Sequence, residues 1–339
     1  LLIAVLVQGY NHWWLDTPWL AWMLIGSIVL LSVALYIEHH RRNPMLQTRW
    51  FVLAPTVRFV IGALLLRFLT TEQTYGVIGM QRMLGMTVDQ MQPLFIVILL
   101  GTIAGIAVSA LTFGLENMGK QIVGSIVLFA LAAWLDHSRT SLARPEDFFG
   151  SQFLMAVGAG LFMGPLMLIG VVQGLKFGAH YMLTAIVTIS MTQAMGALMG
   201  SALLSTYQMH REQVYSAAIV ADVDPTDPIV ADRLRLQQQS LARVIADPAL
   251  RAAQGTAQLA QAARREANVR AYNDVFALTA GVAVLYLLWM LALAGRARQR
   301  AFVERMRAAA ADASAMRGTD AAAPQDAPGQ PPTQPVARA

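Results

Sequence analysis

Apolar runs of membrane-spanning length recur along this 339-residue chain and limit the folds that it can adopt. A helix needs about 20 mostly apolar residues to cross a bilayer, because hydrocarbon offers its backbone no other hydrogen-bond partner. Hydrophobic residues make up 56% of the chain and charged residues 13%, which disfavours a water-soluble domain. Full spans are expected near Trp19–Ile37, Phe51–Thr71, Pro93–Phe113, Gln121–Trp134 (in its fuller extent Gly119–Asp136), Gln152–Val172, Tyr181–Thr206 and Phe276–Ala294.

The chain also begins inside an apolar run, Leu1–Val7. Residues 1–17 lack the basic start, short apolar core and small-residue cleavage site of a signal peptide. The first residue is leucine and not an initiator methionine. We therefore expect that an N-terminal part is missing and that this run is the end of an earlier span.

Basic residues predict the orientation of the spans, because Lys and Arg accumulate in loops that stay in the cytoplasm. If the spans alternate, the short basic segments all fall on one side; they contain Arg41, Arg42, Arg49, Lys120, Lys176, Arg296, Arg298 and Arg300. The other side receives residues 9–18, 72–92, 136–150 and 207–272. The sequence thus predicts a cytoplasmic C-terminus. The absence of cysteine excludes disulfides and cysteine metal sites in this chain.

The long outer segment, residues 207–272, has its own helix signals. Asp227-Pro228 and Asp247-Pro248 each offer an N-cap followed by proline at the first helical position. We expect amphipathic helices over Pro228–Ile245 and Pro248–Arg270, the second of which can run into the final span. They form either a cap over the bundle or a docking surface for another protein. From about Ala308 the tail is rich in Ala, Pro, Gln and Asp, which is typical of disorder.

Charged groups at membrane depth are costly and usually serve a pathway or an ion pair. The run from Phe51 carries Arg58, Arg67 and Glu72. Arg58 and Glu72 lie within about 40° of each other around a helix, whereas Arg67 faces almost the opposite way. Arg58 can extend to cytoplasmic headgroups, while Arg67 lies deeper and either lines a cavity or pairs with an acid of a neighbouring helix. Glu72 is a candidate proton or cation site, with a solvated carboxylate at the outer membrane edge as the alternative.

A polar stripe crosses the span that starts at Tyr181, where threonines recur at every fourth position up to Thr192. Thr hydroxyls can bond back to carbonyls of their own helix, which is the simpler interpretation. The amide of Gln193 is harder to satisfy in this way, so Gln193 is the better candidate for a cavity beside Thr192. Gly196 and Gly200 form a small-x-x-x-small pattern that predicts close helix packing.

Two segments have the appearance of binding motifs but lack their context. Residues 114–120 have the glycine and lysine spacing of a phosphate-binding loop, but Gln121 stands where Ser or Thr would hold magnesium. A membrane helix also precedes this segment in place of a strand. His39 and His40 have no carboxylate-assisted ligand set around them. We therefore expect no nucleotide, metal or cofactor site.

Several short segments, taken in order, resemble those of one transporter family. They are Asn43-Pro44-Met45-Leu46, Arg49-Trp50-Phe51, Thr192–Gly200, the long outer loop and Tyr272-Asn273-Asp274-Val275-Phe276. From Leu1 to about Gly295 the chain resembles the fourteen-span drug:proton antiporters of the major facilitator superfamily, which include EmrB-like inner-membrane efflux pumps. The resemblance implies the end of span seven, span eight and a linker in residues 1–50. It further implies a six-helix C-terminal transport bundle in residues 51–295 and a basic, then disordered, cytoplasmic tail in residues 296–339.

The resemblance also implies roles for particular residues. The segment in the place of the superfamily's cytoplasmic gating loop contains Gly114, Glu116, Gly119 and Lys120, with compressed spacing. Asn273 and Asp274 mark the entry to the last span. Gln193 stands where some relatives have arginine, so a charge-dependent role is not carried over. The main proton-coupling carboxylates of such pumps usually lie in the N-terminal half, outside this chain.

The sequence therefore predicts an all-α integral membrane transporter of the bacterial inner membrane. It would export amphipathic or lipophilic compounds by alternating access, driven by inward proton flow. Its expected partners are the bilayer, the small-molecule substrate, protons and, in a tripartite pump, a periplasmic adaptor; no nucleic acid is expected. The cavity is expected to be bordered by Arg67, Glu72, Thr192 and Gln193.

Two other classes compete with transport. A membrane scaffold or sensor that retains the bundle without transporting is the alternative that stays open. An intramembrane enzyme is disfavoured, because no span presents paired acids, a His/acid cluster or an activated nucleophile.

Overall fold

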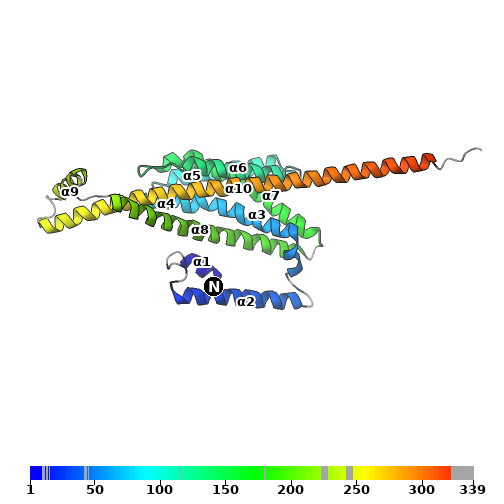
Figure 1. Ribbon diagram of the computed structural model, residues 1–339, viewed down its shortest axis with the longest axis horizontal. Coiled ribbons are helices and arrows are strands. Elements are labelled where there is room, and N and C mark those ends of the chain that lie inside the picture. Colours follow the sequence, from blue (N-terminus) through cyan, green and yellow to red (C-terminus); the bar gives the residue numbers. More distant parts are fainter. Residues whose placement is uncertain are drawn as a thin grey trace, which may run out of the picture. The chain divides into compact units, whose positions relative to one another are not determined.

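The computed structural model describes residues 1–321 except 10, 11, 13, 15, 42, 43, 45, 115, 179, 180, 223–227 and 242–246. Every regular element in this part of the chain is a helix, which confirms the predicted all-α class (Figure 1). In chain order the elements are α1 (Leu2–Gln8), α2 (Pro18–His40), η1 (Thr48–Val52), α3 (Ala54–Thr71), η2 (Glu72–Val77), α4 (Ile78–Met83), α5 (Gln92–Leu111), α6 (Met118–Asp136), η3 (Pro145–Phe148), α7 (Phe149–Leu175), α8 (Tyr181–Asp222), α9 (Pro228–Leu241) and α10 (Pro248–Ala321).

Seven helices among the described residues are long and apolar enough to cross a membrane, and they correspond to the seven predicted spans. Helix α6 has the fuller of its two predicted extents. In α2, the side chains of Trp22, Ile28 and Leu30 are more than half exposed. Such a surface suits a helix that faces lipid and would be a liability in water. The chain is therefore a multi-pass membrane protein.

Two helices run further than the sequence predicts, and a third joins two predicted helices. The chain does not enter a loop at Glu72, because the π-helical turn η2 and then α4 continue α3 to Met83. Helix α8 passes the predicted end at Thr206 and reaches Asp222. Helix α10 runs from Pro248 through the final span without a break. No proline interrupts any of these extensions, so nothing in them forces the helix to stop.

The predicted helices of the outer segment are present as α9 and the beginning of α10. The Asp247 carboxylate accepts a hydrogen bond from the backbone N–H of Ala249 at 2.9 Å, which confirms the predicted N-cap. Asp227, Ile245 and the motif residues Asn43 and Met45 lie outside the described residues. Helix α10 continues past Ala308, where the sequence predicts disorder, and residues 322–339 are again outside the described part.

Helix α7 packs against α3, α5, α6 and α8. Helix α1 contacts both α2 and α8, and so connects α2 to this group. The closest contact of α7 is with α5. A Cβ on Gly105 would overlap the carbonyl oxygen of Val157, and one on Gly160 would lie 2.5 Å from that of Thr102. Because both obstacles are backbone atoms, only glycine permits this approach, as in other membrane helix pairs.

Helices α8 and α3 pack in the way that the small-x-x-x-small pattern predicts. A Cβ on Gly196 would lie 2.8 Å from the Cβ of Arg67, and one on Gly200 would lie 2.5 Å from Oγ1 of Thr71. The predicted role of both glycines in close packing is thus confirmed.

An apolar core fills the bundle beside the end of α3. Its buried members are Val77, Met80, Leu84, Leu94, Ala143, Phe148, Val269, Tyr272 and Phe276. The chain divides into two compact units, Leu1–Leu287 and Leu288–Ala339. The core and all residues of the site described below belong to the first unit.

Candidate functional site

Glu72 lies at the point where α3 changes into the π-helical turn η2. Such turns are rare and occur frequently at functional sites. The side chain of Glu72 is 0% exposed, and neither carboxylate oxygen has a hydrogen-bond partner among the described residues. The alternative of a solvated carboxylate at the membrane edge is therefore wrong.

The surroundings of Glu72 are tightly packed. A Cβ on Gly76, one turn later, would lie 2.7 Å from the ring of Phe276 on α10 and 3.5 Å from Cγ of Glu72. Phe276 and Val77 are both fully buried. The aliphatic part of the Glu72 side chain thus lies against apolar residues, and an ionised and unpaired carboxyl group is costly in such a buried position.

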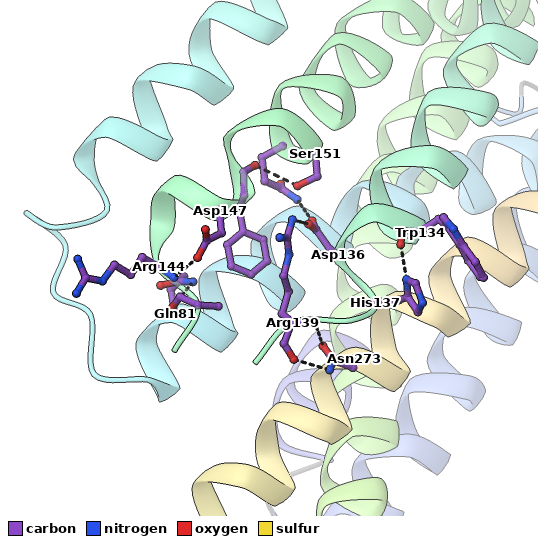
Figure 2. Close-up of polar contacts among 12 residues, drawn as sticks. Gln81, Trp134, Asp136, His137, Arg139, Arg144, Asp147, Ser151 and Asn273 are labelled. Carbon is purple, nitrogen blue, oxygen red and sulfur yellow. Dashed lines mark hydrogen bonds and ion pairs between the residues drawn. The ribbon is translucent and has the colours of Figure 1, made fainter. Parts of the chain in front are cut away.

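A second buried carboxylate, Asp136, ends helix α6. Its Oδ1 lies 2.8 Å from Nη2 of Arg139 in an ion pair, which Figure 2 shows. Its Oδ2 accepts a hydrogen bond from Nε2 of Gln152 on α7 at 3.1 Å. The charge of Asp136 also acts on Glu72, so the two acids from different helices share one electrostatic environment.

Gln152 connects these two acids. Its Nε2 is used by Asp136, whereas its Oε1 is buried and has no hydrogen-bond partner among the described residues. Gln152 is close enough to Glu72 to interact with its carboxyl group, but the pair does not reach hydrogen-bond geometry. We refer to Glu72, Asp136, Arg139 and Gln152 as the acid cluster.

Arg139 lies in the segment between α6 and α7, where contacts with other parts of the chain hold it in place. Asn273 on α10 binds the Arg139 backbone twice: its Nδ2 donates to the carbonyl at 2.8 Å and its Oδ1 accepts from the N–H at 3.1 Å (Figure 2). The guanidinium lies over the ring of Phe148, 4.8 Å from its centroid. Gln81 on α4 donates to the carbonyl of Ala143 at 3.5 Å in the same segment. Asn273, which the family resemblance marks only as an entry motif, thus belongs to the support of this site.

Arg67 lies apart from the acid cluster. It is half-buried against α8, and its Nη1 donates to Oγ1 of Thr70 at 3.2 Å. It forms none of the ion pairs found among the described residues. Of its two predicted roles, pairing with an acid is therefore not found in the described part, and the cavity role stays a prediction.

In the polar stripe of α8, Thr192 and Gln193 differ in their hydrogen bonding as the sequence predicts. The hydroxyl of Thr192 donates to the carbonyl of Thr188 at 2.6 Å, which confirms that this threonine bonds back to its own helix. Both polar atoms of the Gln193 amide are buried and have no hydrogen-bond partner among the described residues. Gln193 stays a candidate for a cavity, since its amide still lacks partners.

The predicted gating loop is short and mostly exposed. Glu116 is exposed, and Gly119 and Lys120 belong to the first turn of α6. Nζ of Lys120 donates to Oδ1 of Asn117 at 3.1 Å. Gly114 is half-buried and Leu115 lies outside the described residues, so the gating role stays a prediction.

Asp274 lies in a different cluster from its neighbour Asn273. It forms an ion pair with Arg211 on α8 and accepts a hydrogen bond from the hydroxyl of Tyr215 at 2.9 Å. Arg211 also donates to the hydroxyl oxygen of Tyr215, at 2.7 Å. This cluster joins the extended part of α8 to α10.

Asp136, Arg139 and Gln152 are absent from the residues that the sequence nominates. The sequence signal for them is weak: Asp136 ends the fuller extent of one apolar run, and Gln152 opens the next. Polar residues at such positions are indistinguishable from ordinary span boundaries. The acid pair also joins two spans, so inspection of single spans cannot reveal it.

The acid cluster brings two carboxyl groups, an amide and one guanidinium together inside a membrane bundle. Groups of this kind can hold or release a proton. The described residues include no group of three or more His, Cys, Asp or Glu side chains placed to bind a metal ion. In comparisons with known proteins, no family model matches this chain and no curated protein matches it.

Proposed function

We propose that this protein is a proton-coupled transporter that exports amphipathic compounds, as its sequence resemblance to drug:proton antiporters implies. The observation that carries the proposal is Glu72, a carboxyl group that is fully buried without a hydrogen-bond partner among membrane-length helices. Ionisable groups at such positions are rare and mark ion pathways and proton relays.

A purely structural role does not account for this residue. A buried polar group without a partner costs about 1–3 kcal/mol. An apolar side chain at position 72 would stabilise a static scaffold better. The acid cluster also joins η2, which continues α3, to α6 and α7, and Asn273 attaches it to α10. A change of protonation there would reach four of the membrane-length helices, as alternating access requires.

The same proposal covers family, orientation and partners. Residues 51–295 would form a six-helix transport bundle of the major facilitator kind in a bacterial inner membrane, with the basic segments in the cytoplasm. Helix α9 and the beginning of α10 would then lie in the periplasm, where an adaptor can dock. A crosslinker at Gln258 on α10 should capture that adaptor, and the recovery of uncrosslinked protein alone would count against this partner.

Transport can be tested with the complete protein in proteoliposomes. A lipophilic cationic dye should move across the membrane when a pH gradient is imposed, and Glu72→Gln should abolish this movement because position 72 can no longer exchange a proton. Glu146→Gln makes the same chemical change on an exposed residue and should transport normally. Transport by Glu72→Gln at the wild-type rate would contradict the proposal, and a wild-type protein that moves no dye would favour the scaffold or sensor.

A further inference from the structure

The acid cluster is electrically balanced only if one of its two acids is neutral. Asp136 already has a cation, because its Oδ1 lies 2.8 Å from Nη2 of Arg139. Glu72 takes part in none of the ion pairs found among the described residues. Two buried carboxyl groups that act on each other disfavour the doubly ionised state. The neutral acid is therefore Glu72.

The unpartnered amide oxygen of Gln152 is compatible with the same assignment. An ionised carboxylate only accepts hydrogen bonds, whereas a protonated one also has an O–H donor. The buried Oε1 of Gln152 is an acceptor that no described donor reaches, because its Nε2 is turned toward Asp136. Glu72 adjoins this amide. A proton on Glu72 would offer this amide oxygen a donor.

We infer that Glu72, Gln152 and Asp136 form a binding site for a single proton, which Glu72 carries and which the Gln152 amide links to the Asp136–Arg139 pair. Release of the proton to water leaves one uncompensated negative charge in a fully buried position. Release therefore requires that water or the guanidinium of Arg139 reaches Glu72. Since Asn273 ties the Arg139 backbone to α10, a displacement of α10 would act on this ion pair.

This inference deepens the proposed function and rests on it for the role of the proton in coupling. Proton binding itself can be measured without any transported compound.

Other titratable groups near this end of the bundle have contacts of their own. His137 stacks on the preceding tryptophan ring, with centroids 4.3 Å apart. Tyr75 on η2 packs against Tyr272 of α10, with ring centroids 6.1 Å apart. Arg211 on α8 and Asp274 on α10 pair with each other. The exposed charged residues on α4, the α6–α7 segment and η3 are Arg82, Arg144, Glu146 and Asp147.

Thermal unfolding of matched variants separates the two acids. Glu72→Gln replaces a neutral acid by a neutral amide of the same length, so the midpoint should stay close to that of the wild type. Asp136→Asn removes the counter-charge of Arg139 and should lower the midpoint. An equal loss in both variants would overturn the assignment, because it would show that Glu72 is also ionised.

Infrared difference spectroscopy on the purified complete protein detects the proton directly. The carbonyl stretch of a protonated carboxylic acid should be present at neutral pH in the wild type and in the exposed control Glu146→Gln. It should disappear in Glu72→Gln and shift in Gln152→Leu, which removes the amide. A wild type without this band, or a band that Glu72→Gln leaves unchanged, would overturn the inference.

The two proposals fail in different ways. If the band depends on Glu72 but the wild type moves no dye, the proton site stands and the proposed transport function is wrong. If the wild type couples dye movement to the pH gradient without such a band, transport stands and the proton site is wrong.

Discussion

At the scale of single residues, Arg139 is the cation on which the charge balance of the site depends. Its partner Asp136 is fully buried, whereas the Arg139 side chain is 24% exposed. Removing one member of a buried pair leaves an uncompensated charge and typically costs about 3–5 kcal/mol. The partial exposure of Arg139 lets water replace some of the lost interaction, which places the cost at the lower end of this range.

We therefore predict that Arg139→Ala lowers the free energy of unfolding by about 3 kcal/mol. A matched control is Arg270→Ala, which removes the cation of an exposed pair with Glu266, where the two side chains are 52% and 42% exposed. That pair should be worth less than about 1 kcal/mol. Unfolding in detergent micelles, followed by circular dichroism, measures both changes. Equal losses in the two variants would contradict the structural role assigned to Arg139.

At the scale of elements, the apolar runs predict which helices exist but not how polar residues at their ends are placed. Helix α5 begins at Gln92, next to the predicted Pro93. By contrast, the polar run from Thr70 to Thr74 resembles the end of a span, and yet the helix continues through it. The hydroxyls of Thr70 and Thr74 donate to carbonyls of the same helical run, so they need no water and can be accommodated in its interior.

The acid cluster is only half predictable for a related reason. Glu72 is recognisable as the carboxylate next to its span, but its burial is not encoded in that segment. Asp136 lies close to Arg139, and the backbone of Arg139 is bound by Asn273, which lies 134 residues away in sequence. No local periodicity reports such a contact.

Helix packing can be tested at glycines that differ only in their neighbours. Gly105→Ala places a methyl group against the Val157 backbone and must separate α5 from α7, at a cost of about 1–3 kcal/mol. A methyl group on Gly281 of α10 would meet no neighbouring helix or side chain of the described part within 4 Å. Gly281→Ala should therefore stabilise the helix by about 0.5–1 kcal/mol. Thermal unfolding should show changes of opposite sign, and a shift in the same direction would contradict the close α5–α7 contact.

At the scale of the whole molecule, the alternation of spans places the acid cluster and the basic segments on opposite sides of the membrane. Lys120 lies in the first turn of α6 and Asp136 ends the helix, so a rise of 1.5 Å per residue separates them by about 24 Å. Because basic loops stay in the cytoplasm, the proposed orientation puts the acid cluster toward the outer side. A proton that drives export enters from that side and would meet Glu72 and Asp136 early in its path.

Labelling of single cysteines tests this orientation, and the absence of cysteine from this chain removes any background within it. Leu142, in the segment after α6, is 84% exposed, and Lys120 is exposed at the opposite end of that helix. In intact cells a membrane-impermeant maleimide should label Leu142→Cys, whereas Lys120→Cys should react only after the membrane is permeabilised. The reverse pattern would contradict the proposed orientation. It would place the acid cluster on the cytoplasmic side, where it could not receive protons from outside. Labelling of both variants in intact cells would contradict α6 as a membrane span.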